Sequence, residues 1–351
     1  MKKLSYLLGV ALVTLFASCD KQDNAVADQE ILPVSTTEQF IEAAAKGGDI
    51  FVAPGAQITL SDEVVLTQPV TIISDVDNPA TITFGEKGIS TNSKFILNNV
   101  IINAQNLTTP LVKMSEMTLA EDQKSVEIDI IQFDQVTVLG LNQQLFYCNK
   151  QSYLIGTLDV ESSLINIAGA AKKTIFDFNG GGNVENLNIN NSTIYADAAT
   201  QWQNGGFFST QSSKEVIDLG GEEKSQNFTI KNSTLYNICK GKTVCTLRKN
   251  NQAYQYYTVK HNIIFNCGKK NEFLVGLATG RINKKENWTA EQNVINWQDA
   301  GSEVEDLSAS EEAKSGLEDP TWEFRITSFA DPEKGNFKQS VTLAGDPRWT
   351  E

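Results

Sequence analysis

The sequence predicts an all-β protein, a single-stranded right-handed parallel β-helix preceded by a short N-terminal capping helix. Three observations predict this fold. A segment of the kind "FTIKNSTLYN" recurs seven times, its copies carry large apolar residues two positions apart, and each copy turns polar before a second apolar stretch. Recurrence at this period is typical of stacked repeats. Apolar residues two apart indicate strands with one buried face, and helical repeats are excluded.

Each copy of the repeat is defined by an anchor residue, and successive anchors lie 27 to 41 residues apart. The anchors are Leu97, Phe133, Val160, Ile189, Ile230, Val259 and Ala290. The residue five positions later is always aliphatic: Ile102, Val138, Ile165, Ile194, Leu235, Ile264 and Ile295. The residue two positions after the anchor is polar: Asn99, Gln135, Ser162, Asn191, Asn232, His261 and Gln292. Parallel stacking turns each column into a ladder of similar side chains about 4.8 Å apart, with the chain bending at the polar column.

The N-terminal residues predict export. Residues 1–18 form a lipoprotein signal peptide, in which Lys2-Lys3 precedes an apolar run and Ala17-Ser18. The run is too short to span a membrane as a mature helix. Cys19, directly after the small residues, resembles the lipidated cysteine of a bacterial lipobox. That resemblance implies acylation of Cys19 and a bacterial outer-membrane anchor at the cell surface, with lipid as the membrane partner.

The remaining segments follow in order. Residues 19–33 are a flexible polar tether, and residues 34–48 a capping helix in which Ser35 and Glu38 have capping-box spacing. This helix would cover the open apolar end of the first coil. The β-helix occupies residues 49–298, and residues 299–351 form an acidic loop and a C-terminal cap.

The Asn232-Ser233-Thr234 segment matches an N-glycosylation sequon, but its place in the repeat predicts another role. We expect Asn232 to be a buried rung of the polar ladder, with its amide bonded between coils. Asn227 begins another apparent sequon, and we expect it to be exposed. His261, the single histidine, belongs to the same polar column and is predicted to be structural.

Composition and charge argue against several classes of function. Without residues 1–18, 43 acids face 27 Lys and Arg residues, since Lys2 and Lys3 are removed from the 29, and the net charge is −16. This acidity argues against a nucleic-acid partner. One histidine disfavours a histidine-based metal site or triad. Cys148, Cys239, Cys245 and Cys267 contain no C-x-x-C pair and are interpreted as small buried residues, with one disulfide left open. We expect no metal or other cofactor and a monomeric protein.

Basic residues gather in one part of this acidic chain. Residues 240–285 hold ten Lys and Arg residues and one acid, Glu272, a charge of +9. Stacking would bring them together into a patch that attracts an anionic polymer, although solvated loop lysines are the alternative interpretation. The candidate substrate-binding residues are Lys240, Lys242, Tyr254, Tyr256, Lys269, Lys270, Lys284 and Lys285. Tyr254 and Tyr256 are placed in loops, where stacking on sugar rings and packing are both open.

An enzyme is the second hypothesis. A β-eliminating lyase needs a base and a cation that neutralises the substrate carboxylate, and Arg248, Lys249 and Arg281 are the candidates for these catalytic roles. Asp177, in "TIFDFNGGG", lies on an earlier copy of the strand "TVCTLRK" that holds Arg248 and Lys249, and it is a further candidate. Calcium would enter only with a lyase mechanism, and no acidic cluster accompanies these residues. The basic region offers no pair of carboxylates for glycoside hydrolysis.

The lipobox, "GDIFVAPGAQITL", the "NSTLYN" and "HNIIFN" turns and the closing "GDPRW" resemble pectate-lyase-like right-handed β-helix lipoproteins of Bacteroidetes. Many of these are domains of unknown function, distantly similar to polysaccharide lyases of the alginate lyase and chondroitinase B type. The resemblance covers nearly the whole mature chain and implies surface-glycan biology. The leading hypothesis is therefore a surface lipoprotein that binds an anionic polysaccharide as an accessory to glycan capture. A uronate-cleaving polysaccharide lyase and a structural or adhesive surface protein are the alternatives.

Overall fold

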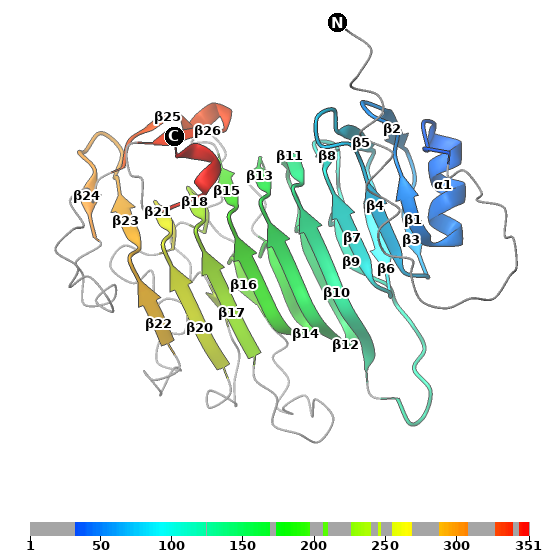
Figure 1. Ribbon diagram of the computed structural model, residues 1–351. Coiled ribbons are helices and arrows are strands. Elements are labelled where there is room, and N and C mark those ends of the chain that lie inside the picture. The colour runs from blue at the N-terminus through cyan, green and yellow to red at the C-terminus, as the bar shows by residue number, and fades with distance from the viewer. Residues whose placement is uncertain are drawn as a thin grey trace, which may run out of the picture. The chain divides into compact units, whose positions relative to one another are not determined.

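The computed structural model describes residues 32–123, 125–168, 173–196, 206–209, 226–239, 245–246, 255–268, 288–307, 327–339 and 344–350. The chain divides into two compact units, Met1–Leu32 and Pro33–Glu351. The helices and strands described below belong to the second unit, which is a parallel β-helix (Figure 1). The predicted fold class is confirmed, including the helix before the first coil. The predicted signal peptide and its Cys19 lie outside the described residues.

Helix α1 (Thr37–Lys46) packs against the first coil and buries Phe40 and Ala44. Its capping box uses Thr36 and Gln39, not the predicted Ser35 and Glu38. The Gln39 N–H donates to Thr36 Oγ1 (3.3 Å), and the Thr36 N–H donates to Gln39 Oε1 (3.2 Å). Thr36 is the N-cap because its backbone is extended directly before the first helical turn, as a capping side chain requires.

Two long sheets and a third row of strands form the coils. The first sheet runs through β1 (Gly48–Phe51), β4 (Val70–Ile73), β7 (Phe95–Asn98), β10 (Val126–Asp134), β12 (Phe146–Glu161), β14 (Phe176–Asn190), β17 (Gln226–Lys231), β20 (Gln255–Lys260) and β22 (Trp288–Glu291). The second sheet runs through β2 (Gln57–Leu60), β5 (Ala80–Phe84), β8 (Val100–Asn103), β11 (Thr137–Leu141), β13 (Leu164–Ile167), β15 (Thr193–Ala196), β18 (Thr234–Tyr236), β21 (Ile263–Phe265), β23 (Val294–Trp297) and β24 (Glu305–Asp306).

The third row begins with β3 (Val64–Leu66), β6 (Ile89–Thr91) and β9 (Val112–Met114). It continues through the N-terminal parts of β12 and β14 to β16 (Phe208–Ser209) and β19 (Cys245–Thr246). The pairs are parallel except β23 with β24 and the C-terminal hairpin of β25 (Phe329–Asp331) and β26 (Asn336–Gln339).

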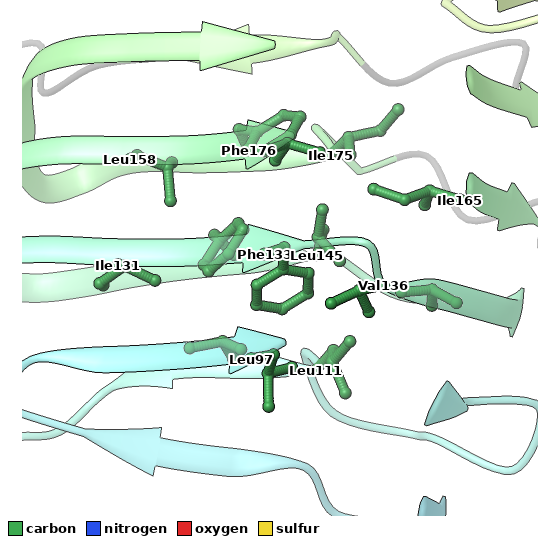
Figure 2. Packing of buried hydrophobic residues seen from close by; sticks show 14 of the residues in the cluster. Leu97, Leu111, Ile131, Phe133, Val136, Leu145, Leu158, Ile165, Ile175 and Phe176 are labelled. Atoms are coloured by element: carbon green, nitrogen blue, oxygen red, sulfur yellow. The ribbon is translucent and has the colours of Figure 1, made fainter. Parts of the chain in front are cut away.

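The predicted apolar columns form the core. Every anchor pairs with the next in register, from Leu97 with Phe133 to Val259 with Ala290, and all are buried. The column from Ile102 to Ile295 is paired and buried in the same way on the second sheet. Figure 2 shows Leu97, Phe133 and Ile165 lying together in this interior. The repeat spacing therefore predicted the strand register correctly.

The polar column marks a sharp corner between the first and second sheets. Its seven residues, from Asn99 to Gln292, all have left-handed backbones with φ between 47° and 55°. Asparagine is favoured there because its short polar side chain tolerates this conformation better than other non-glycine residues. The corner N–H groups donate to carbonyls of the next coil, for example Asn232 N–H to Lys260 O (3.0 Å). His261 occupies the same corner position (φ 55°), and the ladder residue of its coil is Asn262.

The buried polar ladder lies one residue later than predicted. Asn232 is half-buried, whereas Ser233 is fully buried, so the prediction for Asn232 was wrong. The left-handed residue turns its own side chain outward, and the next residue then points inward. The ladder consists of backbone N–H donors and side-chain acceptors in successive coils: Val136 N–H to Ser163 Oγ (3.0 Å), Ser163 N–H to Ser192 Oγ (3.0 Å), Ser192 N–H to Ser233 Oγ (3.2 Å), Ser233 N–H to Asn262 Oδ1 (2.9 Å) and Asn262 N–H to Asn293 Oδ1 (3.1 Å).

Asn227 also differs from its prediction. It is half-buried in β17, and its Nδ2 donates to Asn186 Oδ1 (2.8 Å) in the neighbouring coil. Asn186 Nδ2 donates in turn to the Gly156 carbonyl (3.0 Å). Asn227 therefore belongs to an amide chain on the outside of the first sheet, because its outward position faces equivalent positions of the adjacent strands.

The described C-terminal residues, 327–339 and 344–350, form a segment that we call the strap. It contains β25, the 3-10 turn η4 (Pro332–Lys334), β26 and the 3-10 turn η5 (Pro347–Trp349). Figure 1 shows these elements beside β15, β18 and β21 of the second sheet. Phe337 is fully buried there, with ring centroids 5.1 Å from Tyr195 and 5.5 Å from Tyr236.

Cys148, Cys239 and Cys267 are buried, in agreement with their interpretation as small core residues. Burial raises the pKa of the Cys148 and Cys267 thiols to about 12, so both stay protonated at neutral pH. In the part of the chain that the structure describes, no helix combines the length and apolar character that a membrane crossing needs.

Candidate functional site

The outward-pointing side chains of the first sheet form three polar rows, which we call the outer face. They point outward because strand residues alternate between the core and the surface. The rows follow the strand register: Asn98, Asp134, Glu161, Asn190, Lys231, Lys260 and Glu291; Ile96, Gln132, Asp159, Asn188, Thr229, Thr258 and Thr289; and Ile130, Thr157, Asn186, Asn227 and Tyr256. Along the stack the outer face thus changes from carboxylates through amides to hydroxyls and amines.

Strand β14 carries five asparagines, at positions 179, 183, 186, 188 and 190. Asparagine is depleted in strands, so this concentration needs a reason other than strand propensity. Part of the reason is the amide chain between coils, in which Asn183 Oδ1 accepts from Gln226 Nε2 (3.3 Å). Asn188 and Asn190 are half-buried and face outward beside the carboxylates of β12. They present amide groups that can both donate and accept hydrogen bonds.

Three carboxylates lie on two neighbouring strands of the outer face. Asp134 and Glu161 are register partners, and Asp159 lies two residues before Glu161 on the same side of β12. Each accepts a hydrogen bond from an amide: Asn98 Nδ2 to Asp134 Oδ2 (3.2 Å), Gln132 Nε2 to Asp159 Oδ2 (3.1 Å) and Asn191 Nδ2 to Glu161 Oε1 (2.6 Å). The amides orient the carboxylates without neutralising their charge.

Burial and a neighbouring charge raise the pKa values of Asp159 and Asp134. Burial, followed by the charge on Glu161, raises the pKa of the Asp159 carboxyl to about 6, and the hydrogen bond from Gln132 opposes the shift. Burial and Glu161 also raise the pKa of Asp134. Asp159 can therefore exchange a proton near neutral pH. Among the residues that the structure describes, no group of three histidine, cysteine or acidic side chains is arranged to hold a metal ion.

The opposite end of the outer face carries cations and an aromatic ring. Lys231 and Lys260 are register partners on β17 and β20, and Lys260 Nζ lies 3.0 Å from Glu291 Oε2. Tyr256 is 41% exposed and lies next to Asn227. Its predicted loop position was wrong, because it belongs to β20, but its exposure keeps it available for stacking.

Asp177 lies in the third row of strands, as the repeat predicted. It pairs in register with Tyr147 and Ser209, and Ser209 pairs with Thr246 of β19. Ser209 Oγ donates to Asp177 Oδ1 (2.9 Å). Burial and the Asp177 charge raise the pKa of the Tyr147 phenol. Strands β12 and β14 each run without interruption from the third row of strands into the first sheet, which carries the outer face.

Most of the residues predicted for the site lie outside the described residues. These are Arg248, Lys249 and Arg281 among the catalytic candidates, and Lys240, Lys242, Tyr254, Lys269, Lys270, Lys284 and Lys285 among the binding candidates. Strand β19 ends two residues before Arg248. Their gathering into one basic patch therefore stays a prediction. Tyr256 is the predicted binding residue that the structure places.

The sequence reasoning missed the carboxylates of β10 and β12. Asp134 and Glu161 directly follow the anchors Phe133 and Val160, and Asp159 directly precedes Val160. Positions that flank a buried anchor must face outward, so this signal was present in the aligned repeats. The lyase hypothesis pointed instead to the basic residues 240–285, several coils away.

Comparison with protein families gives one match. A family model described as a domain of unknown function (DUF4957) matches residues 56–197, which contain β2 to β15. The match thus includes the carboxylates, the asparagine strand and Asp177. No match was found among curated proteins or among solved structures.

Proposed function

We propose that this protein binds an extended polysaccharide along the outer face of its first sheet. The observation that supports this most is the register of outward amide, carboxylate and hydroxyl side chains that leads to the exposed ring of Tyr256. Parallel rungs present outward polar groups about every 4.8 Å, so an extended polymer meets a hydrogen-bonding side chain at each step.

The chemistry of these groups suits sugars. A sugar hydroxyl both donates and accepts, and so does an amide, while a carboxylate accepts from two neighbouring hydroxyls. The hydrogen bonds among Asn227, Asn186 and Gly156 hold part of the face in place before a ligand arrives. Preorganisation reduces the entropy lost on binding. A tyrosine ring adds an apolar surface for the faces of sugar rings.

The charge pattern supports an anionic polymer at one end of the face. Lys231 and Lys260 lie at the β17–β20 end, and the basic residues from Lys240 to Lys285 follow in the same part of the chain. The carboxylates of β10 and β12 repel anions at the other end. We propose that uronate or sulfate groups bind near β17 and β20 and that sugar hydroxyls bind the acidic rungs.

We also propose where in the cell this protein acts. The predicted lipobox at Cys19 supports an outer-membrane lipoprotein of the kind found in Bacteroidetes, with the β-helix presented at the cell surface. Such a protein would act as an accessory to glycan capture.

Glycoside hydrolysis is a second candidate function, favoured by Asp159 and Glu161. A glycosidase needs a carboxylic acid that protonates the leaving group and a second carboxylate nearby. The raised pKa of Asp159, about 6, leaves a minor fraction of this carboxyl protonated at neutral pH and a larger one in mild acid, and Glu161 follows two residues later on the same face. New reducing ends that disappear in Asp159→Asn would establish hydrolysis.

A glycan panel tests the binding proposal. Alginate, pectin, glycosaminoglycans and neutral glucans are compared by affinity electrophoresis, followed by calorimetry on any ligand found. Tyr256→Ala should weaken binding about tenfold through the lost ring contact. Leu139→Ala is the matched control, because Leu139 has similar exposure (38%) but lies on β11 of the second sheet.

The outcomes separate the hypotheses. Binding that is insensitive to Tyr256→Ala, or equally sensitive to Leu139→Ala, would remove the outer face as the site. Ultraviolet absorbance from unsaturated uronates, lost in Arg248→Ala or Lys249→Ala, would instead establish a lyase. The absence of binding and of products across the panel would leave the structural or adhesive hypothesis.

A further inference from the structure

The strap contacts coils that are far from it in sequence. In an ordinary solenoid each repeat contacts only its neighbours, so stability is a sum of local terms and the end coils open first. Here Arg348 Nη2 donates to the Ser163 carbonyl (2.7 Å), a contact between residues 185 positions apart. Trp349 Nε1 donates to Thr193 Oγ1 (2.8 Å), across 156 positions.

The strap runs back along the stack, one coil after another. The Thr327 N–H donates to Asn296 Oδ1 of β23 (2.9 Å), and the Gly345 N–H to the His261 carbonyl at the corner before β21 (2.7 Å). The Asp346 N–H then donates to Thr234 Oγ1 of β18 (3.1 Å). Thr193 of β15 and Ser163 before β13 complete the path. Five coils of the described β-helix are thus bridged by one segment.

The path ends at a buried carboxylate and its arginine partner. Asp346 is fully buried, and its carboxylate accepts from Thr193 Oγ1 (2.7 Å) and from Arg348 Nε (3.0 Å). The Asp346 carboxylate is buried whereas the Arg348 side chain is 34% exposed, so removing Arg348 would leave a buried charge without its ion-pair partner, which is unfavourable. Gly345 has φ 85°, and a Cβ there would lie 2.8 Å from Ile263 Cδ1 and 2.9 Å from Thr234 Oγ1. The short "GDPRW" segment therefore has the glycine and the charged side chains that its contacts with the second sheet require.

The two Asn-Ser-Thr segments receive the strap. In each segment the asparagine forms the left-handed corner, and the serine hydroxyl belongs to the buried ladder. The threonine hydroxyl points outward from the second sheet and bonds the strap, at Thr193 and at Thr234. Each residue of the apparent sequon thus has a structural task.

From these contacts we infer that the strap couples the coils of β13, β15, β18, β21 and β23 into one cooperative unfolding unit. Opening the last coil alone would break the strap contact at Asn296 and strain those at Thr234 and Thr193. The strap thereby removes the fraying that an uncapped solenoid end permits. It also covers the outward aromatic side chains of Tyr195, Tyr236 and Phe265, which would otherwise be exposed.

Native-state hydrogen exchange on the full chain tests this inference. Backbone amides of β15, β18 and β21 are followed by mass spectrometry at increasing guanidinium concentrations below the unfolding transition. In the wild type they should share one opening with the same denaturant dependence. In Arg348→Ala the β21 amides should exchange faster than those of β15 by about tenfold, the effect of losing a charged hydrogen bond.

A second test variant and a control variant complete the hydrogen-exchange experiment. Thr193→Val removes one receiving hydroxyl without altering the strap, and it should separate β21 from β15 in the same direction if Arg348→Ala fails to fold. Lys334→Ala is the control, since Lys334 pairs with the nearby Asp331 and its side chain is 82% exposed. It should leave the exchange of all three strands unchanged. Graded exchange from β21 to β15 in the wild type, or variants that accelerate only amides of the strap, would overturn the inference.

Discussion

Removing one hydroxyl from the buried ladder should weaken the fold measurably. In Ser233→Ala the backbone N–H of Ser192 loses its acceptor, which lies 3.2 Å away, at a position where both residues are fully buried. The Lys231 carbonyl loses the hydroxyl as a donor but keeps the Asn191 N–H (3.1 Å). The substitution therefore leaves the buried N–H of Ser192 without its acceptor, which lowers the free energy of unfolding by about 1–3 kcal/mol.

Guanidinium unfolding followed by far-ultraviolet circular dichroism measures this loss as a lower transition midpoint at unchanged slope. Ser61→Ala is the matched control. Its hydroxyl is exposed and lies 3.5 Å from the adjacent Asp62 carboxylate, so the change should stay within about 0.5 kcal/mol. A loss in Ser233→Ala no larger than in Ser61→Ala would show that the ladder is not a stabilising element.

Three other predictions concern the left-handed corner at Asn232, the Asp159 carboxylate and the predicted lipid on Cys19. Asn232→Val should cost about 1–2 kcal/mol because a β-branched residue is strained at φ 47°, whereas Asn232→Gly should cost much less in the same denaturation assay; equal losses would refute the corner argument. The folded-state pKa of Asp159, about 6, is above the ordinary value of 3.8 for an aspartate, so this group destabilises the fold as pH rises from about 4 to above 6. Asp159→Asn should therefore raise the midpoint at pH 7 relative to wild type and lose this advantage at pH 4, and the same difference at both pH values would contradict it. Metabolic labelling with a fatty-acid analogue should mark the wild type and not Cys19→Ser, and equal labelling of both would remove the lipid anchor.

The carboxylates show how far the sequence could predict the candidate site. Alignment of the repeats already placed Asp134 and Glu161 in one outward column, since each directly follows an anchor. The raised pKa values of Asp134 and Asp159 could not be predicted, because they depend on burial by neighbouring side chains and on the distance between the charges. The placement of Tyr256 was missed for a simpler reason: its strand begins earlier than the repeat pattern indicated.

The sequence by itself determined the fold class, the strand register and the corner positions. It did so because apolar residues two apart must share the core face, and because each copy of the repeat places Leu97 and its equivalents at the same point of the coil. Only the tertiary structure decided that Ser233, and not Asn232, enters the ladder, since a left-handed residue reverses which neighbour points inward. Only the tertiary structure decided where the strap docks. Contacts such as Arg348 with Ser163 join residues 185 positions apart, and no local pattern specifies such a pairing.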